Sequence, residues 1–229
     1  MPSTRRRLSR LEKQAQTRAR LLRAAELVFA EHGFFAASLD EIAARAGFSI
    51  GAVYSNFESK GDLFLALLEE HVAGQVRDYL ELFAAGETLD EQARGGADRW
   101  MRYLDEHPDF FPLFLEFAAY AAREPRMRDA FAARLGAFRA AFAGMIERGA
   151  ADLGIELPDG AADQLGIVVN ALGNGLALER LADRNAVPDE LFGSVLALFF
   201  DALAGAARRT KLDAGPQPRA TRSRRDAGE

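Results

Sequence analysis

The sequence has no cysteine among its 229 residues and only three histidines. Without cysteine, the chain forms no disulfide, no thiolate nucleophile and no cysteine-ligated zinc site. This absence also fits the reducing cytoplasm, where disulfides are rare. His32, His71 and His107 lie far apart, and none belongs to the i, i+4 pair of a helical metal site. We therefore expect a cytoplasmic protein with no metal and no cofactor.

Long apolar runs are also missing from the sequence. The uncharged stretch 164–178 contains three amide side chains and is shorter than the roughly 20 residues of a membrane-spanning helix. The arginine-rich start "MPSTRRRLSRLEKQ" is followed by no apolar segment, so it does not predict a secretory signal. Alternating strand patterns are lacking too, although "GIVV" at 166–169 resembles a strand in isolation. We expect no membrane partner.

Positive charge is concentrated at the two ends of a chain whose net charge is −5. Residues 1–25 hold eight Arg or Lys and one acid, and residues 208–229 hold seven and three. A basic segment attracts a polyanion even on an acidic protein, because the local field steers the encounter. The alternative is a solvated tail at each end. For residues 208–229 we favour a disordered tail, because Pro, Gly and Arg leave little to bury there.

Helical patterns cover most of the remaining sequence and predict an all-α fold. Residues 21–29 place apolar side chains on one helix face, and Gly33 follows as a stop signal. "SLDE", from Ser38, has the pattern of a capping box and opens a short helix that ends at Gly47. A second short helix begins near Ser49, and a longer one near Lys60. Further helices are expected over 89–106, 109–123, 125–151, 160–184 and 188–207.

Two of these helices predict contact with a second copy of the chain. The segment 188–207 is apolar nearly all round, so it needs cover on both sides. The segment 160–184 is rich in small residues that allow a neighbouring helix to approach closely. A helix bundle across a two-fold axis satisfies both, and a fully buried monomer helix is the alternative. The candidate interface residues are Gly166, Gly173, Leu191, Val195, Leu198, Phe199 and Ala202.

Residues 38–57 have the outline of a helix-turn-helix, with a capped helix, a turn containing Gly and a second short helix. In "FSIGAVYSNFESKGDLF", at 48–64, small and polar residues surround Tyr54 where a buried helix would carry Leu or Ala. Gly51 and Ala52 would let this helix approach a DNA groove, and Asn56 suits an adenine edge. Lys60 would reach a phosphate.

Residues 15–75 resemble the DNA-binding domain of the TetR family of bacterial transcriptional regulators. The resemblance runs through "TRARLLRAAELVFAEHGFFAASLDEIAARAGFSIGAVYSNFESKGDLF". Ile50 stands where polar side chains are frequent, which suggests contact with a thymine methyl, and Asn56 stands where His is common. The operator sequence therefore cannot be taken from a relative. The resemblance implies DNA contacts by Ser38, Ser49, Ile50, Gly51, Ala52, Tyr54, Ser55, Asn56 and Lys60.

The same resemblance implies that residues 76–207 bind an effector and dimerise. The implied function is a homodimeric repressor on a palindromic DNA operator, released by a small, largely apolar molecule. A transcriptional activator or an effector-independent DNA-binding protein of the same fold is the alternative. Residues 1–14 would form a flexible basic arm, in which Arg5, Arg6, Arg7 and Arg10 either contact DNA or remain disordered.

Aromatic side chains of the central helices are the candidate lining of the effector pocket, although for each of them plain core packing is an alternative. Asn170 and Asn174, one helical turn apart, are the candidate polar contacts. The other candidates are Trp100, Tyr103, Phe111, Phe114, Phe117, Tyr120, Phe138, Phe142 and Met145.

An enzymatic alternative comes from "GFSIG" at 47–51, which matches the G-x-S-x-G nucleophile motif. That motif marks a nucleophilic Ser only where it follows a buried strand and opens a helix. Here "LDEIAARA" precedes it, and this segment has a helical pattern. We therefore do not expect an enzyme.

Overall fold

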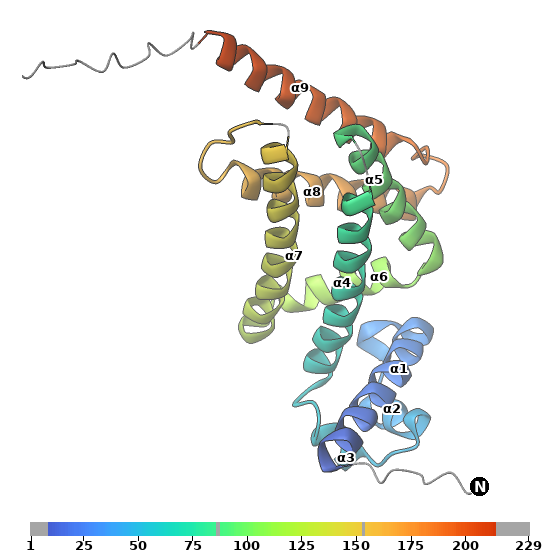
Figure 1. Ribbon diagram of the computed structural model, residues 1–229. Helices are drawn as coiled ribbons and strands as arrows, with labels where there is room; N and C mark the ends of the chain where they lie inside the picture. The colour runs from blue at the N-terminus through green and yellow to red at the C-terminus, as the bar shows by residue number, and fades with distance from the viewer. Residues whose placement is uncertain (1–8, 86–87, 153, 214–229) are drawn as a thin grey trace, which may run out of the picture.

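The computed structural model describes residues 9–85, 88–152 and 154–213 and is drawn in Figure 1. These residues form nine helices and no strand, which confirms the expected all-α fold. The helices are α1 (Arg10–Ala36), α2 (Leu39–Ala46), α3 (Ile50–Tyr54), α4 (Lys60–Ala85), α5 (Leu89–Glu106), α6 (Phe110–Ala121), α7 (Pro125–Asp152), α8 (Ala161–Ala182) and α9 (Leu191–Asp213).

Helices α1, α2 and α3 form a small head at one end of the molecule (Figure 1). Ile42 of α2 and Val53 of α3 are fully buried in it. Gly47 ends α2 in the left-handed conformation, with φ of 72°, which costs a residue without Cβ little. The Ser38 hydroxyl accepts a hydrogen bond from the Glu41 amide at 3.2 Å. The Glu41 carboxylate, however, lies 2.9 Å from His32 Nε2, so only one half of the expected capping box forms.

Helix α1 starts earlier than expected. Ser9 and Glu12 form a reciprocal capping box at its N-terminus, so residues 10–14, assigned to a flexible arm, are helical instead. Arg5, Arg6 and Arg7 of that arm lie outside the described residues. At the other end Gly33 interrupts α1 with φ of 75°, as predicted, but one more turn follows before Ala37.

Helix α4 runs from the head into a larger helical body, in which α8 and α9 lie farthest from the head (Figure 1). In the body α5 packs along α9 and α7 packs along α8. Helix α9 continues to Asp213, so residues 208–213 are helical rather than part of the expected disordered tail. The segment 206–213 contains no Gly or Pro to end a helix. Residues 214–229 lie outside the described residues.

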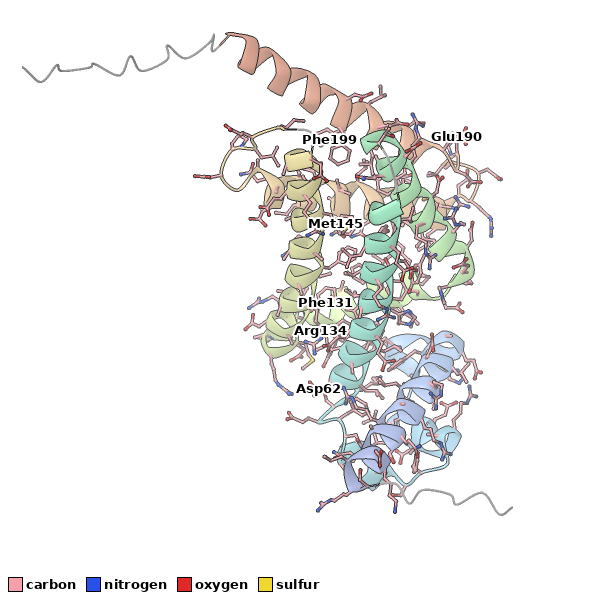
Figure 2. The ribbon with its side chains drawn as sticks, in the orientation of Figure 1. Asp62, Phe131, Arg134, Met145, Glu190 and Phe199 are labelled. Atoms are coloured by element: carbon pink, nitrogen blue, oxygen red, sulfur yellow. The ribbon has the colours of Figure 1, made fainter. Side chains whose placement is uncertain are left out.

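Two apolar clusters divide the interior. One contains the head residues together with Phe117 of α6 and Phe131 of α7, so the head shares its core with the base of the body. The other joins α5, α8 and α9 around Phe192 and Trp100. Figure 2 shows Phe131 on the part of α7 nearer the head and Met145 farther along the same helix.

None of the helices within the described residues combines the length and the apolarity needed to cross a membrane.

Candidate DNA interface and effector cavity

The outward face of α3 is small apart from one aromatic ring. Tyr54 is 60% exposed, whereas Val53 on the opposite side is fully buried. Ser49, Gly51 and Ser55 are exposed as well, and a Cβ on Gly51 would touch only the Ser49 hydroxyl, at 3.7 Å. This face therefore offers little resistance to a close approach and presents a phenol for hydrogen bonding.

Two of the expected base-reading residues have other contacts in this structure. Ile50 is half-buried and packs against the head core, so only part of its side chain faces outward. Asn56 is half-buried and donates its amide to the Ala52 carbonyl at 2.8 Å. The Asn56 carbonyl accepts a hydrogen bond from the Arg18 guanidinium at 3.3 Å. A base contact by Asn56 would have to replace the bond to Ala52.

Lys60, expected to anchor a phosphate, joins α4 to the end of α1. Its ammonium donates to the carbonyl oxygens of Phe35 and Ala37, both at 2.9 Å. The same ammonium lies 4.9 Å from the centroid of the Phe34 ring. Burial lowers the pKa of Lys60, an effect that the nearby Glu116 carboxylate opposes. In this structure Lys60 therefore closes the turn between α1 and α2.

Two arginines of α1 hold the helix-turn-helix in place, a role that the sequence did not predict. The Arg18 guanidinium lies 4.4 Å from the centroid of Phe57, and that of Arg20 lies 4.6 Å from the centroid of Phe48. Arg20 also donates to the Ala46 carbonyl at 2.8 Å, at the end of α2. These aromatic residues flank α3, so part of the positive charge of α1 has a structural function.

A cavity of about 70 Å³ lies among α4, α5, α7, α8 and α9. Six of the expected pocket residues line it: Trp100, Phe138, Phe142, Met145, Asn170 and Asn174. The lining includes no Asp, Glu, Lys, Arg or His side chain among the described residues. Among the lining residues not expected from the sequence, Phe192, Leu196 and Phe200 follow one another at i, i+4 spacing along α9. The others are Tyr79, Gln92, Ala93, Gly96, Ala97, Ile146, Val169 and Gly173.

Five aromatic residues expected in this pocket lie outside it. Phe114, Phe117 and Tyr120 belong to α6, which packs toward α1 and α7. The ring of Phe34 lies 5.2 Å from Phe117 and 5.0 Å from Tyr120. Tyr103 and Phe111 contact the Trp100 ring, with centroids at 5.9 and 6.5 Å, but do not line the cavity.

Gly166 and Gly173 are buried inside the chain, so the prediction that they line a dimer interface is wrong. A Cβ on Gly166 would lie 3.2 Å from the Arg139 carbonyl of α7. A Cβ on Gly173 would lie 3.2 Å from the Phe192 ring, and the Gly173 carbonyl accepts a hydrogen bond from Trp100 Nε1 at 3.1 Å. The small side chains of α8 thus serve packing within one chain.

An apolar surface on α8 and α9 remains uncovered. Leu198 is 70% exposed, Leu191 and Val195 are over one third exposed, and Ala202 is exposed as well. Phe199 is half-buried, with its ring centroid 5.7 Å from that of Phe200. Helix α8 adds four apolar side chains that are about half exposed: Ile167, Val168, Leu178 and Leu181.

Two polar junctions are among the contacts that tie the body to the head. Glu116 of α6 accepts a hydrogen bond from the Phe34 amide at 2.7 Å. His71 of α4 lies between Tyr103, whose hydroxyl is 2.6 Å from Nδ1, and Glu26 of α1, whose carboxylate is 3.3 Å from Nε2. The fold also brings the ring of His107 within 5.8 Å of the His71 ring, although these histidines looked unrelated in the sequence.

The surroundings of Ser49 differ from those of a nucleophile elbow. Ser49 follows helix α2 and the left-handed Gly47, whereas the motif requires a preceding strand, and the described residues contain none.

Comparison with known proteins agrees with this division into head and body. Residues 21–67 match the family described as "Bacterial regulatory proteins, tetR family", and residues 90–205 match "BetI-type transcriptional repressor, C-terminal". The chain is 32% identical over 101 residues to the transcriptional activator FasR of Mycolicibacterium smegmatis, covering 44% of this chain and 46% of that protein. It is 32% identical over 109 residues to the repressor SCO4008 of Streptomyces coelicolor, covering 47% and 53%. The matches thus span about half the length of these relatives.

Solved structures share the whole fold. A regulator from Pseudomonas aeruginosa superposes with a TM-score of 0.69 at 22% identity, over 91% of this chain and 99% of that one. The Bacillus subtilis regulator FadR, in complex with stearoyl-CoA, gives 0.63 at 17% identity, over 81% and 97%. Because both domains match families of these regulators, and the C-terminal match alone covers half of the sequence, the chain belongs to the TetR family of bacterial regulatory proteins.

Proposed function

We propose that this protein is a homodimeric, cytoplasmic transcriptional repressor whose binding to a palindromic operator is released by a small, largely apolar effector. The observation that carries the proposal is that one chain combines two features. It has an exposed α3 face of small residues around Tyr54, and a separate uncharged cavity in the body.

On the DNA side, α3 would enter the major groove with Tyr54 hydrogen-bonding a phosphate. Ser49 would contribute a further hydrogen bond from the same exposed face, and Gly51 would allow the backbone to approach. Ser55 would donate to DNA only after releasing the Gly51 carbonyl, to which its hydroxyl donates at 2.7 Å. The bonds of Lys60 to two carbonyls leave one of its three donors for a phosphate. Base reading by Ile50 and Asn56 would require both side chains to turn outward.

Dimerisation would cover the exposed apolar residues of α8 and α9. A palindromic operator requires two recognition helices about 34–36 Å apart, which a single chain does not supply. Leu198, Val195 and Val168 are the strongest candidates for the interface, because isolated chains rarely leave so many apolar side chains together in water.

Effector release would use the two junctions between body and head. A ligand that binds the cavity more tightly when the heads are wrongly spaced for DNA lowers the affinity for DNA. The reduction is at most the difference between the ligand's binding free energies for the two arrangements of the heads. Trp100 lines the cavity and stacks on Tyr103, which contacts His71, which in turn reaches Glu26 of α1. The complex of the neighbour FadR with stearoyl-CoA supports effector binding in this fold.

Activation is a second candidate outcome, because one of the relatives is a transcriptional activator.

Selection of genomic fragments by the purified protein, followed by a gel-shift assay, tests the proposal. We expect a shifted complex containing two chains, on sites that overlap promoters. No shift of any genomic fragment at low salt would reject it. In a reporter assay, deletion of the gene raises expression from these promoters for a repressor and lowers it for an activator.

A further inference from the structure

The lining of the cavity indicates the charge of its ligand. Its walls are aromatic and aliphatic, with the rings of Tyr79 and Phe142 5.0 Å apart and those of Phe138 and Phe142 4.9 Å apart. No lining residue in the described part of the chain carries a charged side chain. An anion placed there would lose its hydration without gaining a counter-charge, which is strongly unfavourable, and a cation would gain only the faces of the aromatic rings.

Three polar side chains in the lining lack partners. Asn170 and Asn174 are half-buried and make no hydrogen bond to another described residue. Tyr79 is only 4% exposed, and its hydroxyl likewise has no partner among the described residues. Tyr79 is also one of the residues that line the cavity, so a ligand there is the partner available to it. Burial raises the pKa of Tyr79, so the phenol stays neutral and able to donate.

The size of the cavity sets a further limit. At about 70 Å³ it is smaller than the roughly 150 Å³ engineered cavity that takes up benzene. A ligand with one ring therefore has to move part of the wall. Met145 is the flexible part of that wall, because its unbranched side chain adopts many shapes.

We propose that the effector is an uncharged, mainly hydrocarbon molecule of about one ring in size, with a carbonyl, amide or hydroxyl group that hydrogen-bonds Asn170, Asn174 and Tyr79. This inference rests on the proposed function, since it assigns the ligand class of the same cavity. Carboxylates and acyl thioesters of coenzyme A are excluded as ligands held entirely within the cavity.

Trp100 provides a direct measurement, because it is the only tryptophan of the chain and lines the cavity. The full-length protein is titrated with benzamide, benzoate and benzyltrimethylammonium, three probes that share a ring and differ in charge. Changes in Trp100 fluorescence and in melting temperature are recorded. We expect saturable binding of benzamide and at least tenfold weaker binding of both ions. Preference for either ion, or no saturable response to benzamide up to 20 mM, would overturn the proposal.

Variants test the hydrogen bonds separately from the shape of the cavity. Tyr79→Phe and the double variant Asn170→Leu/Asn174→Leu should each weaken benzamide binding about threefold to tenfold, the loss expected for one hydrogen bond. Toluene, which has no polar group, should bind both variants about as well as the wild type. Tyr120→Phe, outside the cavity, is the matched control and should leave benzamide binding unchanged. Equal benzamide affinity in all variants would contradict the assigned hydrogen bonds.

This titration contains no DNA, so its result is independent of the gel-shift assay. Binding of an ion in place of benzamide would reject the ligand class and leave the regulatory proposal standing. A protein that binds benzamide as expected but shifts no genomic fragment would keep the ligand class and lose the regulatory proposal.

Discussion

The amide of Phe34, in the head, donates a hydrogen bond of 2.7 Å to the carboxylate of Glu116, in the body. The bond lies directly after Gly33, where α1 is interrupted. A side chain on Gly33 would collide with the same carboxylate, because its Cβ would lie 2.8 Å from Glu116 Oε1. The interruption of α1 thus creates both the free amide and the space that Glu116 occupies.

Replacement of Glu116 should therefore loosen the head from the body. Glu116→Ala leaves the Phe34 amide without its acceptor, and we expect a loss of about 1–3 kcal/mol in the free energy of unfolding. Glu147→Ala, which removes an exposed carboxylate from α7, is the control and should change stability by less than about 0.5 kcal/mol. Urea denaturation of both variants measures the difference, and equal stabilities would refute the role of Glu116.

Lys60 should matter for stability as well as for DNA. Lys60→Met keeps an unbranched chain over Phe34 but removes the donor to Phe35 and Ala37. We expect a loss of about 1–2 kcal/mol in stability and a reduction of the salt dependence of DNA binding by about one phosphate. Unchanged stability together with the reduced salt slope would show that Lys60 serves DNA alone.

His71 should make stability depend on pH. Burial lowers its pKa below the ordinary value of about 6.5, while Glu26 opposes and His107 reinforces this shift. As pH falls below 6.5, the unfolded chain takes up the proton before the folded chain does, so stability is full above pH 6.5 and is lost toward the lower folded pKa. The free energy of unfolding falls by at most about 1.4 kcal/mol per pH unit through this one group.

The variant His71→Gln checks this assignment. Tyr103 and Glu26 face His71 directly, and Glu106, His107 and Asp109 line the adjoining cleft. If His71 is the titrating group, denaturation of the variant between pH 5 and 6.5 should show a shallower fall in stability than the wild type. An identical fall in both proteins would assign the effect to another of these groups.

Gly173 should tolerate no side chain, because its Cβ would lie 3.2 Å from Phe192 and 3.4 Å from Trp100 Nε1. We expect Gly173→Ala to lower stability by about 1–3 kcal/mol through overpacking and to shift Trp100 fluorescence. Gly136→Ala, also within a helix, meets only a flexible Arg139 side chain at 3.9 Å and should raise stability by about 0.5–1 kcal/mol. A thermal melt that ranks the two variants the other way would contradict this packing.

Local signals made the head predictable from the sequence. The signals that begin or end its helices act through the local backbone. They are Gly33, which interrupts α1, and Ser38 and Gly47, which begin and end α2. The positions of these helix ends could therefore be predicted from the order of residues along the chain. The start of α1 was predictable as well, since "SRLE" at 9–12 has the capping-box pattern. Its basic surroundings instead suggested an arm.

The cavity was only partly predictable, because its lining depends on packing between distant segments. Phe117 and Tyr120 of α6 face the head core, and this orientation follows from contacts with Phe34, which lies about 80 residues earlier in the sequence. Gly166 and Gly173 suggested a close helix contact, which the structure confirms, but the partner helices belong to the same chain. The spacing of small residues predicts a helix face that another helix can approach closely, but it does not predict which helix covers that face.

The most direct test of the central claim compares wild type and Tyr54→Phe on one selected promoter duplex by fluorescence anisotropy over a range of salt concentrations. If α3 is the DNA-contacting helix, two wild-type chains bind per duplex and affinity falls as salt rises. The variant should then bind about tenfold more weakly, at unchanged melting temperature, because it lacks one hydrogen bond to a phosphate. Equal affinity of the two proteins, or one chain per duplex, would contradict the account.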